Sequence, residues 1–230
     1  MGMGEVLKEG TTESYRERIA RRAALEVKSG MLINLGIGIP TLVADFIPEE
    51  KNVLFHAENG IVGTGPSPQL GEENPNLCNA GGFPVTLMPG ASFFDSATAF
   101  AIIRRGLLDM TILGVLEVSQ RGDIANWIVP GKRVPGMGGA MELAQKAKKV
   151  LVLTTHLDKN GRSKIVRECK LPLTAQGSAD MIITDMAVME VKTDGLHLLE
   201  VMHPYTVADV IGATEAELLF SGGGEVTTFF

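Results

Sequence analysis

The residue of this chain best placed to do chemistry is Glu58, which stands between an apolar run and a glycine-rich segment. Val53-Leu54-Phe55 is typical of a buried strand, and Gly60, Gly63 and Gly65 are expected to end it. Glu58 is therefore expected at the carboxyl end of a strand, where ligands and reacting groups collect in an open α/β sheet. A carboxylate in that position is a candidate nucleophile or general base.

The segment around Glu58 also allows an interpretation without chemistry. Asn59-Gly60 is a strong hairpin-turn signal, so Glu58 could be an ordinary solvated residue at the start of a tight turn. Asn59 could orient the neighbouring carboxylate or only adopt the turn conformation. His56 would share the face of Glu58 in a regular strand, either as a nearby cation or, as is more common, as a hydrogen-bonded core histidine.

A second glycine-rich segment, Gly136-Met137-Gly138-Gly139, directly precedes a predicted helix. Its backbone N–H groups have no bulky side chains in front of them, so they could donate hydrogen bonds to an oxyanion. Preorganised donors of this kind stabilise a transition state by about 3 to 4 kcal/mol. The alternative is that these glycines only allow a helix to pack closely on a sheet.

The elements expected to position these residues alternate between strands and helices. A capping box from Ser14 to Glu17 begins a predicted helix over residues 14–28. Apolar runs predict strands at 31–35, 53–55, 110–118 and 150–153, and helices are predicted at 41–46, 97–105 and 138–147. The first strand carries Asn34 near its end. The chain between Glu58 and Ser92 is predicted to be one long loop that serves a site.

The last third of the chain has a different pattern. Short apolar runs at 179–184, 187–191 and 196–201 are separated by turn residues, as in hairpins, and residues 207–211 suggest a short helix. The predicted fold class is α/β, with a largely parallel sheet covered by helices on both faces and antiparallel hairpins toward the C-terminus. Residues 1–230 are interpreted as a single domain.

Composition excludes several other classes of protein. The 230 residues carry a formal net charge of −6, which argues against nucleic-acid binding as the main activity. Cys78 and Cys169 are the only cysteines, so neither a disulfide framework nor a zinc site is indicated, and no metal site is expected. No secretory signal and no apolar stretch of about 18 residues is found, so we expect no membrane association and a cytoplasmic location.

Six segments of the chain together resemble the β subunit of the 3-oxoacid coenzyme A-transferases, from about residue 34 to at least residue 172. The segments are Glu58-Asn59-Gly60, Gly63 to Pro66, Leu87 to Ser92, Gly122 to Trp127, Pro130-Gly131-Lys132 and Gly136 to Met141. The resemblance implies a fold of the CoA-transferase/NagB-like type. It implies that Glu58 is the catalytic nucleophile and that the backbone amide of Gly139 is an oxyanion donor. It also implies an α subunit as partner, which supplies the other donor.

The resemblance implies transfer of coenzyme A between an acyl-CoA and a carboxylic acid, such as the 3-oxoacid acetoacetate, through a glutamyl-CoA thioester. No cofactor is then needed, because coenzyme A is itself a substrate. Asn34, Asn59, Gly60 and Gly138 are candidates to bind or orient the reactants, and Lys132 either meets a coenzyme A phosphate or lies in solvent.

The chain departs from the family at one position that bears on the acid substrate. Gly82 follows Asn79-Ala80-Gly81 where the mammalian enzymes that use succinyl-CoA have a lysine, which weakens succinate as the partner acid. Acetate, butyrate or an amino acid such as β-alanine stay open. Two other functions also stay open: an acyl-CoA hydrolase on the same site, and a non-catalytic ligand-binding regulator on a related scaffold.

Overall fold

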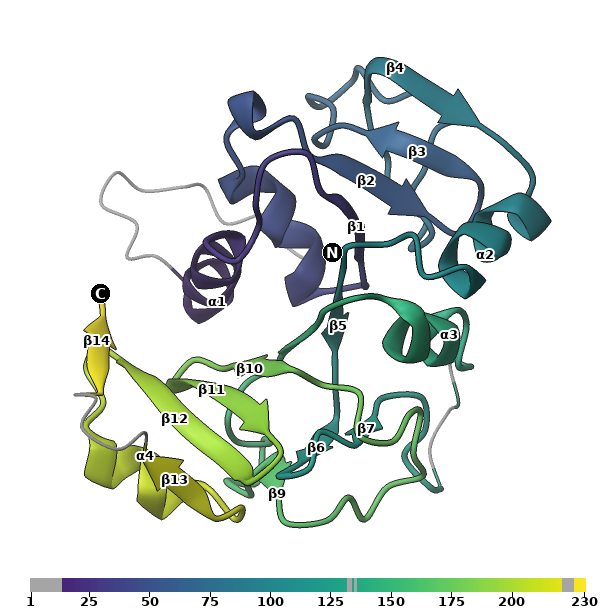
Figure 1. The fold of residues 1–230 in the computed structure, drawn as a ribbon. Helices are drawn as coiled ribbons and strands as arrows, with labels where there is room; N and C mark the ends of the chain where they lie inside the picture. The colour runs from purple at the N-terminus through teal and green to yellow at the C-terminus, as the bar shows by residue number, and fades with distance from the viewer. Residues whose placement is uncertain (1–13, 132–133, 135, 221–225) are drawn as a thin grey trace.

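The computed structural model describes residues 14–131, 134, 136–220 and 226–230, whose helices and strands are drawn in Figure 1. The α-helices are α1 (Tyr15–Ala24), α2 (Ser96–Arg104), α3 (Ala140–Lys146) and α4 (Val207–Ala213), and two 3₁₀ helices are η1 (Ile39–Phe46) and η2 (Glu49–Lys51). The strands of an 11-stranded sheet are β1 (Leu32–Leu35), β2 (Leu54–Ala57), β3 (Ile61–Thr64), β4 (Leu87–Phe93), β5 (Met110–Gly114), β8 (Val150–Leu153), β10 (Met181–Ile183), β11 (Ala187–Lys192), β12 (Gly195–Met202), β13 (Leu218–Phe220) and β14 (Thr227–Phe229). A 3-stranded sheet contains β6 (Glu117–Ser119), β7 (Ile124–Ala125) and β9 (Ile165–Val166).

The centre of the large sheet is parallel, in the order β10-β8-β5-β1-β2, as the sequence predicts. The chain passes from β1 to β2 on one side and from β5 to β8 on the other, so the direction of winding reverses between β1 and β5. In open α/β sheets such a reversal opens a crevice beyond the carboxyl ends of the strands, where ligands bind. The fold therefore marks the ends of β1 and β5 as the expected binding region.

Helices cover both faces of this sheet, which confirms the prediction. Alternate residues of a strand point to opposite faces, so the central strands contribute side chains to two separate hydrophobic cores. Met110 of β5 packs in the core that contains Ile19 of α1, and Leu113 packs in the core that contains Ile103 of α2 and Leu143 of α3. Figure 1 shows α1 on one side of β5 and α2 and α3 on the other.

Antiparallel strands lie at both edges of the large sheet. The hairpins predicted toward the C-terminus are present as β10, β11 and β12. At the opposite edge β2, β3 and β4 are also antiparallel, so the prediction of one long loop between Glu58 and Ser92 is wrong. Gly63, with φ of 89°, lies at a register shift in β3, and a glycine at such a bulge continues a strand instead of ending it.

Several helices and strands have bounds in the structure that differ from the predicted ones. The capping box at Ser14 and Glu17 is confirmed, but α1 ends at Ala24 and does not reach residue 28. The apolar run at 110–118 divides into β5 and β6, which belong to different sheets. Segment 41–46 forms the later part of the 3₁₀ helix η1. None of the helices in the described ranges is both long and apolar enough to span a bilayer.

Candidate active site at the end of the central strands

Glu58 lies directly after β2, where Glu58, Asn59 and Gly60 connect this strand to β3. Both structural predictions for the segment are met, because a hairpin turn begins here at the carboxyl end of a parallel strand. The Gly60 N–H donates to the Ala57 carbonyl at 3.0 Å. Gly60 has φ of 113°, and an added Cβ would lie 2.0 Å from the Phe94 carbonyl oxygen, so only glycine fits. The turn therefore fixes the point from which the Glu58 side chain extends.

The carboxylate of Glu58 is held by Asn34, at the end of β1. The Nδ2 group of Asn34 donates to Oε2 of Glu58 and to the carbonyl oxygen of His56, both at 3.0 Å. Asn34 is fully buried and Glu58 is half-buried. In the described part of the chain no lysine or arginine forms a salt bridge with Glu58, so the neutral amide of Asn34 is the group that orients the carboxylate.

His56 is buried beside this pair and acts as a hydrogen-bonded core residue. Its Nε2 lies 3.2 Å from the carbonyl oxygen of Ala99, which can only accept, so Nε2 carries the proton. Its Nδ1 lies 3.4 Å from Nδ2 of Asn34 and is left to accept. Burial lowers the pKa of His56. The neutral imidazole therefore supports Asn34, and the alternative of a cation beside Glu58 is not supported.

Gly139, distant in sequence, lies against Glu58. A Cβ added to Gly139 would lie 3.0 Å from Oε1 and 3.2 Å from Cγ of Glu58. Gly139 is the cap residue of α3, and a salt bridge of 2.8 Å between Arg104 and Glu142 ties α3 to α2. The backbone of Gly139 can thus approach the carboxylate because no side chain intervenes. Gly138 is exposed in the same segment with φ of 53°.

Glu58 forms part of the wall of two cavities. The larger cavity, of about 650 Å³, is lined by Gly36 after β1, Gly114 of β5 and the segment 136–140, and so lies at the reversal point of the sheet. The smaller cavity, of about 370 Å³, has a mainly apolar lining that includes Leu42 of η1 and Phe83. A group attached to Glu58 could therefore extend in either of two directions.

Asn59 lies in the turn, in keeping with one of its two interpretations, and its side chain makes a further contact. Its side-chain Nδ2 donates to the carbonyl oxygen of Cys78 at 2.7 Å, so Asn59 ties the turn to the chain that precedes β4. Lys132 lies outside the described residues. Among the residues that the structure does describe, no cluster of His, Cys, Asp or Glu side chains is suited to hold a metal ion.

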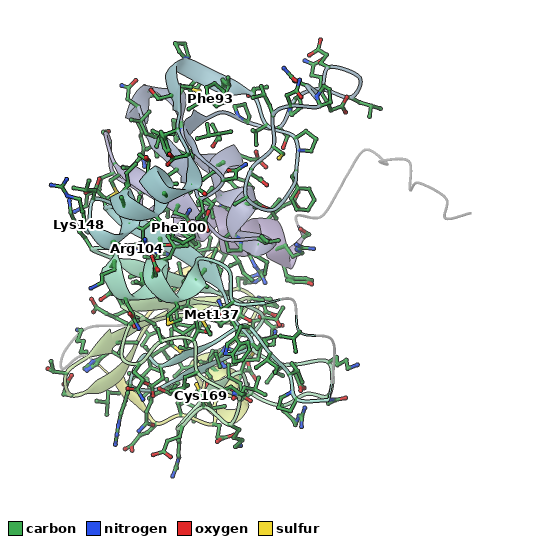
Figure 2. The ribbon with its side chains drawn as sticks, turned by 90° about the vertical axis from the view of Figure 1, so that its right-hand side faces the viewer. Phe93, Phe100, Arg104, Met137, Lys148 and Cys169 are labelled. Carbon is green, nitrogen blue, oxygen red and sulfur yellow. The ribbon has the colours of Figure 1, made fainter. Side chains whose placement is uncertain are left out.

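Phe100 is a site residue that the sequence does not predict: it lines the larger cavity, and its Cε1 would lie 3.4 Å from a Cβ on Gly139. No local signal marks it, because Phe100 occupies an ordinary apolar position of α2. Figure 2 shows Phe100 beside Arg104, and Met137 of the same cavity below them. All three lie in the middle of the molecule, between the part that carries Phe93 and the part that carries Cys169.

Similarity to known proteins extends over nearly the whole chain. The family model "Coenzyme A transferase" matches residues 16–213. The probable beta subunit of a coenzyme A transferase from Bacillus subtilis is 57% identical over 209 residues, which cover 91% of this chain and 96% of that protein. One subunit of the succinyl-CoA:3-ketoacid coenzyme A transferase of Helicobacter pylori is 49% identical over 202 residues, covering 88% of this chain and 97% of that protein.

Among solved structures, an acyl-CoA transferase apoenzyme from Escherichia coli O157:H7 has the same fold, with a TM-score of 0.75 at 23% identity. The match covers 96% of this chain but 44% of that longer one, so this chain spans less than half of it. A carboxylate at the end of a parallel strand, against a bare glycine backbone, is thus found on a fold shared with acyl-CoA-handling proteins. From the family match and the identity to its relatives, this chain belongs to the coenzyme A transferase family.

Proposed function

We propose that this chain is the catalytic β subunit of a heteromeric coenzyme A-transferase, with Glu58 as nucleophile. The observation that carries the proposal is the placement of one carboxylate, held by Asn34, at the boundary of two cavities and against Gly139. A transferase must bring an acyl group and a long thiol cofactor to the same atom. Two cavities that meet at Glu58 provide a separate space for each.

The proposed chemistry has two linked attacks in each half-reaction. The Glu58 carboxylate attacks the thioester carbonyl of an acyl-CoA, which gives an acyl-glutamyl anhydride and coenzyme A thiolate. The thiolate then attacks the glutamyl carbonyl, which gives a glutamyl-CoA thioester and releases the first acid. The second acid reverses these steps and leaves with coenzyme A. Coenzyme A is a substrate in this scheme, and no other cofactor takes part.

Each attack places negative charge on a carbonyl oxygen, which needs a preorganised donor. We assign the backbone amide of Gly139 as one donor, since its α-carbon lies against the Glu58 side chain and carries no side chain of its own. An α subunit would supply the other donor. The Bacillus subtilis and Helicobacter pylori relatives are both named as one subunit of an enzyme, which supports a partner chain here. We place this enzyme in the cytoplasm.

The acid substrate is proposed to be a 3-oxoacid such as acetoacetate. The name of the Helicobacter pylori relative supports a 3-ketoacid on one side of the reaction. That name also includes succinyl-CoA, whereas Gly82 of this chain has no side chain with which to bind a second carboxylate. Acetate or butyrate would fit the smaller cavity, whose lining is mainly apolar but includes the cation Arg16, which a second carboxylate would also meet. Parallel assays with succinyl-, acetyl- and butyryl-CoA will identify the donor.

The test is to trap the intermediate on the assembled enzyme. Incubation with acyl-CoA in the absence of an acceptor acid should build up the glutamyl-CoA thioester, which borohydride reduces to an alcohol. Peptide mass analysis should locate that change at Glu58. Glu58→Gln keeps the shape of the side chain and should lower kcat by at least about 10³-fold with an unchanged folded structure. The chain without its α subunit should be inactive and should gain activity when the two are mixed.

Three outcomes would change the proposal. Release of free acid at full rate without an acceptor would make the enzyme an acyl-CoA hydrolase. Modification at another residue would remove Glu58 from the covalent step. Full transferase activity of the isolated chain would show that no α subunit is needed.

A further inference from the structure

A row of buried polar side chains crosses three neighbouring parallel strands below the site. His56 of β2 is in register with Asn34 of β1, and Asn34 is in register with Thr111 of β5. Their exposed fractions are 3%, 0% and 0%, respectively. Residues in register on adjacent parallel strands share a face of the sheet, so these side chains lie side by side. Three polar residues in the interior of a sheet need a reason, because burying a polar group is unfavourable unless it is hydrogen-bonded.

One half of this row is fully accounted for by hydrogen bonds. Nδ2 of Asn34 has two hydrogens and faces three acceptors, namely the His56 carbonyl, Nδ1 of His56 and Oε2 of Glu58. An amide turned by 180° would put its oxygen against the carboxylate and the carbonyl, which repel it. The orientation of Asn34 therefore decides whether Glu58 meets a donor or an acceptor.

The other half of the row lacks partners. Oδ1 of Asn34 and Oγ1 of Thr111 are both buried and have no hydrogen-bond partner among the described residues. One is an acceptor and the other carries a donor hydrogen. Native proteins leave few buried polar groups unsatisfied, and an exception calls for an explanation. The two groups do not bond to each other in this conformation of the chain, but an unpaired acceptor beside an unpaired donor, on adjacent strands and on one face, is explained if a rotation of the Thr111 side chain joins them in the assembled enzyme.

We propose that Thr111 is a positioning residue: in the assembled enzyme its hydroxyl donates to Oδ1 of Asn34 and so holds the amide with Nδ2 toward Glu58. This inference rests on the proposed transferase function. The function already assigned uses Glu58 and Asn34 but gives no role to Thr111, which lines neither cavity.

The bond has its largest effect in one half of the reaction. While Glu58 is a free carboxylate, its charge alone strengthens the bond from Nδ2 and orients the amide. Once Glu58 carries coenzyme A as a neutral thioester, that charge is gone and the amide depends on His56 and Thr111. The acceptor acid then bonds to the glutamyl carbonyl carbon, negative charge returns to the glutamyl oxygen, and the C–S bond breaks to release thiolate. An amide that has turned opposes this step.

The experiment compares Thr111→Val with Thr111→Ser in the enzyme assembled with its α subunit. Thioester is formed with acyl-CoA, excess donor is removed, and acceptor acid is added while the new acyl-CoA is followed. We expect Thr111→Val to discharge the thioester about five- to tenfold more slowly, the size of one lost hydrogen bond. Thr111→Ser keeps the hydroxyl and should stay within about twofold of the native rate.

Thermal unfolding separates positioning from support of the fold. Thr111→Val removes a buried hydroxyl that has no partner in the isolated chain, so its Tm should equal or exceed that of the native chain. Thr154→Val is the matched control, because the Thr154 hydroxyl donates to the Val115 carbonyl at 3.2 Å and Thr154 lines neither cavity. That variant should lose Tm while its thioester is discharged at the native rate.

A double-mutant cycle supplies the decisive comparison. If Thr111 acts through Asn34, adding Thr111→Val to Asn34→Ala should slow discharge no further. The inference would be overturned if Thr111→Val slowed thioester discharge as much in the Asn34→Ala variant as it does alone. It would also be overturned if Thr111→Val alone discharged its thioester at the native rate. A fall in Tm shared by Thr111→Val and Thr111→Ser, with equal loss of rate, would overturn it as well. If native enzyme forms no trappable thioester, the proposed function fails instead, so the two failures are distinguishable.

Discussion

Gly139 shows how one missing side chain makes room for a reacting group. Its φ of −80° is available to every residue, so the backbone does not require glycine there. Space does require it, since a methyl group would meet Oε1 and Cγ of Glu58 at 3.0 and 3.2 Å. The glycine is therefore explained by the carboxylate beside it, and a substitution tests that contact without straining the chain.

Gly139→Ala should lower kcat by about tenfold or more, because the added methyl displaces the Glu58 carboxylate from its position against the backbone amide. The unfolding free energy should change little. Gly212→Ala is the control, since its new methyl meets no atom within 4 Å. Steady-state kinetics on the assembled enzymes measure kcat for both variants. A native kcat in Gly139→Ala would show that the close approach of Gly139 to Glu58 is not needed.

The position of Glu58 at the end of an apolar run makes it a candidate from the sequence, but the run leaves a solvated turn residue open as well, and the role of nucleophile follows from the family resemblance. The contact of Glu58 with Gly139 follows only from the family resemblance, since no local pattern links the two segments. Asn34, 24 residues before Glu58, was a candidate, but the bond to Oε2 required the register of β1 and β2. Thr111 could not be found at all, because a threonine within an apolar strand carries no signal of its own.

At the scale of elements, the hairpin between β2 and β3 holds Glu58, the proposed nucleophile. Two positive-φ glycines of this region differ in their surroundings. A Cβ on Gly60, with φ of 113°, would lie 2.0 Å from the Phe94 carbonyl oxygen, whereas Gly71, with φ of 89°, has no atom within 4 Å of an added Cβ. The first position combines backbone strain with a clash, and the second has strain alone.

Gly71→Ala should lower the unfolding free energy by about 1 to 2 kcal/mol, the usual penalty of an L-residue in the left-handed region, and should keep activity. Gly60→Ala should lose more, because the Phe94 carbonyl belongs to the backbone and cannot move aside. It should also lose most of its transferase activity, as the turn shifts Glu58. Denaturant unfolding measures the stability of both variants, and steady-state kinetics measure their activity. Equal losses of unfolding free energy in Gly60→Ala and Gly71→Ala would show that the clash with the Phe94 carbonyl has no effect.

Most helices and the parallel strands could be predicted because their signals are local. Ser14 and Glu17 form their capping box within one turn, and the apolar run 150–153 can hardly be anything but a buried strand. The antiparallel edge formed by β3 and β4 could not be predicted in this way. Gly63, Pro89 and Gly90 interrupt its pattern, and pairing with distant strands overrides those breaks.

At the scale of the whole molecule, His156 joins segments that are far apart in the chain. It is fully buried, and its nitrogens lie 2.9 Å from the hydroxyls of Thr184 and Thr214. The Thr214 hydroxyl donates to the Val210 carbonyl, so Nε2 of His156 donates to Thr214 and Nδ1 accepts from Thr184. Burial lowers the pKa of His156 to about 4. That residues 1–230 form a single domain stays a prediction.

Acid should therefore destabilise the fold through His156. In the unfolded chain His156 binds a proton below its ordinary pKa of 6.5, whereas in the folded chain it stays neutral down to about pH 4. Stability is thus present above pH 6.5 and is lost as the pH falls through that window, by roughly 3 kcal/mol. His156→Gln has no such proton, so its unfolding free energy should fall by that much less between pH 7 and pH 4. If the unfolding free energies of the native chain and of His156→Gln fell equally with pH, this prediction would be contradicted.

The contacts of α1 have a consequence for the order in which the protein is made. Arg22 of α1 pairs with Glu200 of β12 at 2.6 Å, 178 residues later, and Arg21 donates to the Phe230 carbonyl at 3.0 Å. Ribosomes add about 5 to 20 residues each second, so α1 waits on the order of 10 to 40 s for these partners. The core that holds Ile19 of α1 contains Val43 of η1 and also Met202 of β12, so early elements can cover only part of the apolar side of the helix, and the rest stays open to chaperones until β12 has been made.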